Sequence, residues 1–144
     1  MICRRFLRPG HSGANNKMAI FTHVTVGTND LEQATKFYDA AFGALGLKNL
    51  GAFGDSATAY GAQAPEFLVL KPRDGKPATH ANGGTIGFMA PSRKAVDAFH
   101  AAGLANGGAC EGEPGPRDVM PNAYGAYLRD PDGNKLCAYC MAAE

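Results

Sequence analysis

The sequence predicts an α+β fold built from two βαβββ modules within one chain of 144 residues. Runs rich in β-branched and aromatic residues alternate with segments whose apolar residues recur every three or four positions. The order of strand, helix and short strands occurs twice, with matching residues 62 to 64 positions apart. Nineteen glycines and nine prolines supply the turns that such short elements need.

The first module opens with a strand and a helix. Residues 20–26 are β-branched and aromatic and predict a strand that ends before Gly27. Asn29, with Glu32 three residues later, has the form of a capping box at a helix start. Apolar residues then form one helical stripe, which is expected to pack on a sheet, and Gly46 is expected to end the helix.

Short strands and a second helix follow. Three strands are expected over residues 50–53, 57–60 and 66–71, and a loop over residues 76–84. The second module then begins with a strand over residues 85–89, and Ser92 is expected to cap a helix whose apolar stripe includes Val96 and Phe99. Further strands are expected near residues 109–111 and 124–129, and Asp130-Pro131-Asp132-Gly133-Asn134 predicts the turn of a last hairpin.

The repeat supports the two-module organisation independently of any single element. His23 lies fourteen residues before Phe37, and Thr85 lies fourteen residues before Phe99. Further along, the residues at 59–62 are echoed at 123–126. Such agreement in order and spacing indicates a duplicated unit, so we expect one domain over residues 18–144, with modules at about 19–75 and 83–141. Residues 1–17 are set aside as a flexible N-terminal extension.

Charge and cysteine content exclude several classes of function. Fourteen basic and thirteen acidic side chains leave a net charge of +1, so the chain has no overall field for binding nucleic acid or an anionic membrane. Residues 1–17 lack the apolar stretch of a secretory signal. The four cysteines are not spaced as a disulfide framework, which favours a reducing compartment and a cytoplasmic location.

Two segments carry a resemblance to a known family. Residues 23–47, HVTVGTNDLEQATKFYDAAFGALGL, and residues 126–140, AYLRDPDGNKLCAYC, resemble the vicinal oxygen chelate superfamily of glyoxalase I, extradiol dioxygenases and bleomycin-resistance proteins. Residues 90–118 are similar to single-domain glyoxalase-like members, and the resemblance covers residues 19–141. It implies curved mixed sheets around a cleft that often holds a divalent metal, and a homodimer.

The resemblance also implies where metal ligands would lie. His23 matches the first-strand histidine, which would serve as a ligand or as an acid/base. The matching position in the second module is Thr85, here a substrate-binding candidate, and the last-strand glutamate position is Cys137. The fourth position falls at Phe67 or Leu68. Zn, Ni, Fe or Mn needs three or four His or carboxylate ligands, so this set is incomplete. The alternative for His23 is a hydrogen-bonded pocket or core histidine.

Several further residues are candidates for contact with a substrate. Arg117 lies in a proline- and glycine-rich loop that borders the substrate cavity in resembling proteins, where it would bind an anionic group. Tyr124 and Tyr127 are three apart in one strand and therefore face opposite sides, so one of them should enter the pocket. Tyr139 shares a face with Cys137 and is a third tyrosine candidate.

Other motifs have simpler interpretations. Cys137 and Cys140 form a CxxC, but on a strand they point to opposite faces, which disfavours a disulfide or a shared zinc ion. Cys137 alone is interpreted as a small buried apolar residue. His100 is interpreted as a surface or helix-packing histidine. The glycines at 103–108 follow a helix instead of preceding one, so they offer no phosphate site.

Two functions remain open at this point. The first is a glyoxalase-like enzyme, a lyase, isomerase or oxygenase acting on an oxygen-rich or thiol-conjugated small molecule, and the resemblance to lactoylglutathione lyases and dioxygenases points to it. The second is a metal-free protein of the drug-resistance type that binds or sequesters a small molecule in a shaped pocket. Stoichiometric metal that is lost in a His23→Ala variant would favour the enzyme.

Overall fold

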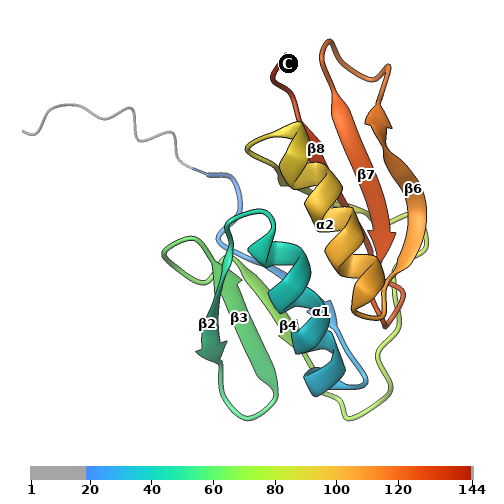
Figure 1. Ribbon diagram of the computed structural model, residues 1–144. Helices are drawn as coiled ribbons and strands as arrows, with labels where there is room; N and C mark the ends of the chain where they lie inside the picture. Colours follow the sequence, from blue (N-terminus) through green and yellow to red (C-terminus); the bar gives the residue numbers. More distant parts are fainter. Residues whose placement is uncertain (1–18, 144) are drawn as a thin grey trace, which may run out of the picture.

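The computed structural model describes residues 19–143 and contains the two predicted modules, each with one helix and a four-stranded mixed sheet (Figure 1). The extension predicted for residues 1–17 lies outside the described residues. The first module consists of β1 (Val24–Gly27), α1 (Leu31–Gly43), β2 (Lys48–Ala52), β3 (Ala57–Gly61) and β4 (Phe67–Leu70). The second consists of β5 (Ile86–Met89), α2 (Arg93–Ala105), β6 (Ala109–Pro116), β7 (Tyr124–Arg129) and β8 (Lys135–Cys140).

The two sheets have the same topology. The strand order is β1-β4-β3-β2 in the first sheet and β5-β8-β7-β6 in the second. In each sheet the first strand runs parallel to the last, and the other pairs are antiparallel. The duplication predicted from the sequence is therefore confirmed, and β1 and β5 are corresponding edge strands.

A single core joins the modules. The buried faces of α1, α2 and one face of each sheet belong to the same apolar cluster. Phe88 of β5 crosses the boundary, since its ring lies 4.9 Å from that of Phe42 and 5.6 Å from that of Phe67. The structure therefore behaves as one packed unit, with the helices between the sheets (Figure 1). Within residues 19–143 neither helix has the length and apolar character that crossing a bilayer requires.

The start of α1 differs by one residue from the prediction. Asp30, and not Asn29, is the N-cap, and its Oδ1 accepts a hydrogen bond from the backbone N–H of Gln33 at 3.1 Å. The α2 cap is as predicted, since the Ser92 hydroxyl accepts from the backbone N–H of Ala95 at 3.0 Å. Both aspartate and asparagine are good N-caps, so adjacent Asn29 and Asp30 are difficult to distinguish by sequence.

Asn29 instead fastens the segment that connects the modules. Its Oδ1 accepts from the backbone N–H of Ala78 at 2.7 Å, and its Nδ2 donates to the Ala78 carbonyl at 3.2 Å. The backbone N–H of Asn29 also donates to Oδ1 of Asp132 in the last hairpin turn, at 2.8 Å. Asn29 thus binds the connecting segment and the second module at one point, and we call these contacts the Asn29 clamp.

The strands β1 and β6 differ most from the expected lengths. The strand predicted over residues 20–26 is regular only from Val24, because its partner β4 begins at Phe67, after Pro65. Ile20 and Phe21 are exposed. The strand predicted near residues 109–111 extends to Pro116, because β6 pairs with the whole length of β7 through two register shifts.

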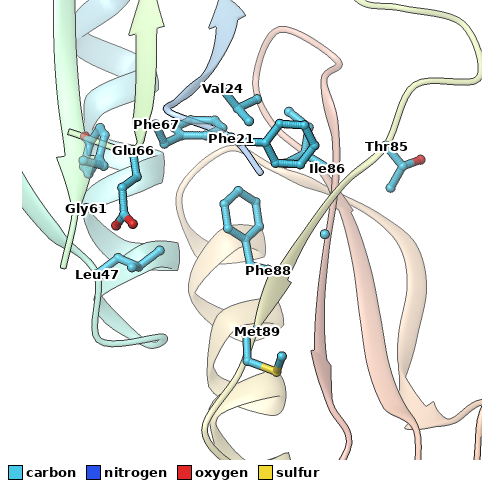
Figure 2. A pocket seen from close by; sticks show the side chains of 12 residues that line it. Phe21, Val24, Leu47, Gly61, Glu66, Phe67, Thr85, Ile86, Phe88 and Met89 are labelled. Atoms are coloured by element: carbon cyan, nitrogen blue, oxygen red, sulfur yellow. The ribbon is translucent and has the colours of Figure 1, made fainter. Parts of the chain in front are cut away.

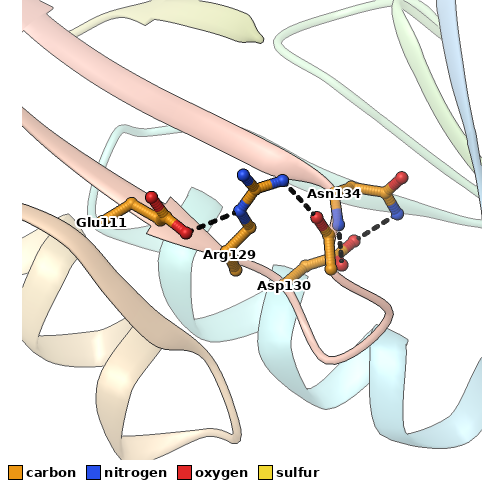
Figure 3. Close-up of polar contacts among 5 residues, drawn as sticks. Glu111, Arg129, Asp130 and Asn134 are labelled. Carbon is orange, nitrogen blue, oxygen red and sulfur yellow. Dashed lines mark hydrogen bonds and ion pairs between the residues drawn. The ribbon is translucent and has the colours of Figure 1, made fainter. Parts of the chain in front are cut away.

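The last hairpin turn is confirmed and is built around Asp130 (Figure 3). Its Oδ1 accepts from the backbone N–H groups of Asp132 and Asn134, each at 2.9 Å. Its Oδ2 accepts from Asn134 Nδ2 at 2.8 Å and from the Tyr38 hydroxyl of α1 at 2.6 Å. Asn134 Nδ2 also donates to the Gly27 carbonyl at 3.0 Å. The turn therefore holds the second module against the first.

The β6 strand carries an irregularity at Glu111. Cys110 pairs with Leu128 and Gly112 with Tyr127, so Glu111 is an extra residue in the ladder. Its carboxylate accepts from Arg129 Nε at 2.8 Å, as Figure 3 shows, and Arg129 lowers the pKa of that carboxyl. The bulge shifts the alternation of side chains along the rest of β6.

Candidate ligand-binding site

A pocket of about 560 Å³ lies between the two modules (Figure 2). It is bounded by the start of β1 and the segment before it, by the end of β3, by the start of β4, and by β5. Apart from Glu66 and Thr85 its lining is apolar or aromatic, and it comprises Phe21, Val24, Leu47, Tyr60, Gly61, Glu66, Phe67, Thr85, Ile86, Gly87, Phe88 and Met89. This composition, mostly apolar with few polar groups, is typical of small-molecule sites.

Aromatic side chains form one side of this pocket. Figure 2 shows Phe21, Phe67 and Phe88 around the same space. Phe67 is buried in the core and Phe88 is half-buried, so each presents part of its ring to the pocket. Phe21 is exposed at the mouth. These rings form a surface that fits a planar or apolar molecule.

Glu66 is the charged residue among the described lining residues. In Figure 2 its carboxylate lies in the pocket near Leu47. The backbone N–H of Ala62 donates to Glu66 Oε2 at 3.3 Å and holds the side chain in place. Glu66 has no basic residue beside it in the pocket lining, so the carboxylate is available to pair with a positive or hydrogen-bond-donating group of a ligand.

Strand β5 is also the wall of a second, smaller pocket. That pocket measures about 240 Å³ and combines Gly87, Phe88 and Met89 with Tyr139 and Met141. Gly87 pairs with Cys137 across the ladder, and a Cβ atom on Gly87 would lie 3.3 Å from the Cys137 sulfur. The absence of a side chain at Gly87 therefore makes room for the Cys137 sulfur beside β5.

Tyr127 and Tyr139 form a hydrogen-bonded pair on the same face of the second sheet. Their hydroxyl oxygens are 2.7 Å apart and their rings meet edge to face with centroids 5.9 Å apart. The hydrogen bond to Tyr139, together with burial, raises the pKa of Tyr127 to about 12. The Tyr127 hydroxyl is therefore neutral at physiological pH. A Cβ on Gly125 would lie 2.7 Å from the Tyr139 ring, so the ring can lie here only because Gly125 has no side chain.

Cys137 lies next to this tyrosine pair and is buried. Burial raises the pKa of its thiol, and nearby Lys135 and the Tyr127 hydroxyl only partly offset that effect. The thiol is therefore protonated at neutral pH, which disfavours a role as nucleophile. Cys140 belongs to the main core whereas Cys137 does not, which agrees with the expectation that they point to opposite faces of one strand. Both are free thiols.

Two positive charges flank Tyr127. The guanidinium carbon of Arg117 is 5.9 Å from its ring centroid, and the Lys135 ammonium is 5.3 Å away. Arg117 is fixed by its own loop, since its Nη1 donates to the carbonyls of Gly115 and Pro116 and its Nη2 donates to that of Glu113. The structure thus brings Arg117, Tyr127, Tyr139 and Cys137 together.

The other three predicted site residues lie outside this cluster. His23 is exposed just before β1, where its Nδ1 lies 3.0 Å from the Thr22 hydroxyl, and it lines none of the described pockets. Thr85 directly precedes β5 and lines the main pocket, but not the smaller pocket that Tyr139 lines. Tyr124 faces α2, where its hydroxyl donates to Asp97 Oδ1 at 2.6 Å. It therefore lies on the opposite face of the sheet from Tyr127.

The residues at the family's four ligand positions do not fit a divalent metal. His23 and Thr85 are exposed. The remaining position in the first module is Phe67 or Leu68. Phe67 belongs to the main apolar core and Leu68 to a small apolar cluster. Cys137 is a neutral, buried thiol. These positions offer one imidazole and one hydroxyl beside apolar side chains and a protonated thiol. A divalent ion needs more ligand atoms than this set supplies. No chemical step is assigned to a metal at this position.

Sequence reasoning missed Glu66 and Phe88 as site residues. Both lie in segments predicted as strands, where Phe88 would be interpreted as core and Glu66 as a solvent-facing end. Glu66 and Phe88 come close together because α1 packs against α2, which places β4 and β5 on either side of the pocket. A charged residue at the start of an otherwise apolar strand was the one signal that could have marked Glu66.

The fold and pocket define a two-module protein with an apolar cleft between the modules, and comparison with known proteins identifies its family. The model of the Glyoxalase/Bleomycin resistance protein/Dioxygenase superfamily matches residues 20–138. The chain belongs to this superfamily, which confirms the resemblance inferred from the sequence. A search of the curated proteins finds no match.

Solved structures show the same fold. A glyoxalase/bleomycin resistance protein from Albidiferax ferrireducens T118 is 53% identical, with a TM-score of 0.76 over 84% of this chain and 98% of that one. A lactoylglutathione lyase from Agrobacterium tumefaciens is 22% identical, with a TM-score of 0.58 over 84% and 92% of the two chains. A glyoxalase-related enzyme from Fulvimarina pelagi is 16% identical, with a TM-score of 0.66 over 85% and 88%.

Proposed function

We propose that this protein binds a small organic molecule in the pocket between its modules without a metal ion at the family's ligand positions. The observation that carries the proposal is the pocket itself, in which aromatic and aliphatic side chains surround a single carboxylate, that of Glu66. Such a site suits an apolar or aromatic body with a cationic or hydrogen-bond-donating nitrogen, because the rings attract cations and the carboxylate pairs with them.

A matched series of indoles tests this proposal by titration calorimetry. Tryptamine, 3-methylindole and indole-3-acetate share one ring system and differ in charge at the side chain. We expect one molecule to bind per chain, with tryptamine binding most tightly and indole-3-acetate most weakly. Dialysis against EDTA, or addition of Zn, Ni, Mn or Fe, should leave these affinities unchanged.

Glu66→Gln is the variant that tests the role of the carboxylate. The preference for tryptamine over 3-methylindole should shrink by up to about fivefold, which corresponds to the roughly 0.2–1 kcal/mol of an exposed ion pair. Glu32→Gln is the matched control, since Glu32 is an exposed carboxylate of α1 paired with Lys36. If none of the three indoles binds, or if Glu66→Gln leaves the preference for tryptamine as large as in the wild type, the proposed site is wrong.

Catalysis is a second candidate, and the Tyr127 and Tyr139 hydroxyls beside Cys137 favour it. Such a pair could donate a proton to a substrate oxygen. Neither tyrosine lines the larger pocket, and the Cys137 thiol is protonated, so these observations support binding more than turnover. An assay for lactoylglutathione lyase activity, the activity named for the Agrobacterium neighbour, should give no turnover above background. Turnover that falls in Tyr139→Phe would favour the enzyme.

We further propose that the protein is a cytoplasmic homodimer. Ile20, Phe21 and Met89 are large, exposed apolar residues on or beside the edge strands β1 and β5, and a second copy would cover them. The free thiols of Cys110, Cys137 and Cys140 are consistent with a reducing compartment.

Light scattering during size-exclusion chromatography tests the dimer. Met89→Glu should lower the measured mass to that of a monomer. Val119→Glu is the control, because Val119 is similarly exposed but lies in the loop between β6 and β7. A monomeric wild-type protein at high concentration would contradict the proposal.

A further inference from the structure

A second cluster of reactive side chains lies away from the pocket, between α2 and β6. His100 is buried on α2, whereas Cys110 and Glu113 are exposed on β6. The His100 Nε2 is 3.2 Å from the Cys110 sulfur, and the Cys110 sulfur is 3.6 Å from Oε1 of Glu113. One ligand atom from each residue lies within 4.8 Å of the other two. None of these residues lines the pocket between the modules.

The bulge at Glu111 creates this arrangement. Cys110 pairs with Leu128, which is buried against the helices, so Cys110 is on the face toward α2. Without an extra residue, Glu113 would point to the opposite face, because it is three positions further along the strand. The extra residue restores Glu113 to the face of Cys110, opposite His100.

The spacing of the three donors suits a tetrahedral cation. With a Zn–S bond of about 2.3 Å and a Zn–N bond of about 2.0–2.1 Å, a tetrahedral angle separates the sulfur from the nitrogen by roughly 3.5 Å. The sulfur has almost this separation from both of its neighbours. The Glu113 side chain is exposed and can rotate to complete the geometry. Thiolate, imidazole and carboxylate are the ligands that Zn²⁺ takes in proteins.

A nucleophilic triad fits these contacts less well. In a triad the base contacts the nucleophile and the acid orients the base. Here the carboxylate of Glu113 contacts the sulfur of Cys110, where it would repel a thiolate. A divalent cation between the two removes that repulsion. The arrangement therefore favours a metal site over a reactive cysteine.

We propose that His100, Cys110 and Glu113 form a Zn²⁺ site with solvent water as the fourth ligand. Binding would replace the Cys110 proton, which passes to solvent, so affinity should rise with pH. The ion would join α2 to β6 and stabilise the folded chain. This site is independent of the proposed ligand pocket and of the family's ligand positions.

Metal titration of EDTA-treated protein tests the site. All proteins carry Cys3→Ser, so that only the described thiols remain. Zn²⁺ is titrated in competition with a chromophoric chelator, and Co²⁺ is added to detect the near-ultraviolet charge-transfer band of a cobalt–thiolate bond. We expect one ion per chain, a thiolate band, and a higher melting temperature with Zn²⁺.

Variants identify the ligands. Cys110→Ser should abolish the thiolate band and weaken Zn²⁺ binding by at least about 100-fold, and exposed Glu113→Gln should weaken it by at least about tenfold. Glu111→Gln and Cys137→Ser are controls that remove a nearby carboxylate and a different thiol, and both should bind as the wild type. Binding that survives in Cys110→Ser and Glu113→Gln, or that is lost in Cys137→Ser, would overturn the proposal. So would the absence of stoichiometric binding.

Discussion

At the scale of single residues, the buried carboxyl of Asp130 makes the stability of the fold depend on pH. Burial raises its pKa, and hydrogen bonds from Tyr38, Asn134 and Asp132 only partly offset that effect. The folded state therefore holds the Asp130 proton more tightly than the unfolded chain does. The stability gained from this group is complete below the ordinary aspartate pKa and is lost as the pH rises through the raised pKa.

Tyr38→Phe tests the strongest of these hydrogen bonds. It removes the 2.6 Å bond from the Tyr38 hydroxyl to Asp130, which supports the charged carboxylate. At neutral pH the free energy of unfolding should fall by about 1.5–3 kcal/mol, and by about 1 kcal/mol once Asp130 is protonated. Urea unfolding over a range of pH values measures both. Tyr124→Phe removes a hydrogen bond of the same length to exposed Asp97, and it should lower the free energy of unfolding by less than Tyr38→Phe does at every pH.

The tyrosine pair gives a second prediction at this scale. Tyr127 should lose its proton at about pH 12, because its hydrogen bond to Tyr139 favours the neutral phenol. Tyr139→Phe should move the pKa of Tyr127 back toward the ordinary tyrosine value. NMR of ring-labelled tyrosine follows this titration, with Tyr124→Phe as the control. A Tyr127 that titrates normally in the wild type would show that the pair does not form in solution.

At the scale of secondary-structure elements, two helical glycines have opposite surroundings. A Cβ on Gly43, at the end of α1, would meet nothing within 4 Å. A Cβ on Gly103 of α2 would collide with Leu128 of β7 and lie 3.2 Å from Phe37 of α1. Close packing of α2 against the sheet and α1 therefore depends on the absence of a side chain at Gly103.

The same substitution should thus have opposite effects at the two positions. Gly43→Ala should stabilise the protein by about 0.5–1 kcal/mol, because alanine restricts the unfolded chain and favours helix. Gly103→Ala should destabilise it by about 1–3 kcal/mol through overpacking. Chemical denaturation of the two variants measures both changes. Equal effects would mean that α2 does not pack as described.

The elements also show which parts of the fold the sequence could predict. Helical stripes, Ser92 and the Asp-Pro-Asp-Gly turn are local signals, and the elements they mark occur as predicted. The length of a strand depends instead on its partner, so the ends of β1 and β6 were wrong. Gly112 directly follows Glu111, but glycine and proline recur through residues 112–116, so the sequence does not show at which residue the register shifts.

At the scale of the whole molecule, the binding site depends on packing between modules. Tyr127, Tyr139 and Cys137 share one sheet face and could be grouped by alternation along strands. Glu66 and Phe88 belong to different modules, and contacts between the modules, such as those of α1 with α2, determine their separation. Contacts between modules leave no periodic signal in the sequence, which is why the main pocket was not predicted residue by residue.

The shared core predicts that the modules unfold together. Helices α1 and α2 bury their apolar faces against each other and against both sheets in one cluster. Far-ultraviolet circular dichroism and tyrosine fluorescence should therefore give coincident unfolding curves, and the calorimetric and van't Hoff enthalpies should agree. Two separate transitions, or a stable fragment ending near residue 80, would show that each module folds independently.

The Asn29 clamp also affects how copies of this chain can assemble. A molecule that traded its second half with a neighbour would first have to release Ala78 and Asp132 from Asn29 and swing the connecting segment outward. Domain swapping proceeds through such hinge segments. By tying its hinge to the start of the first helix, the chain slows that exchange and keeps its own two halves together.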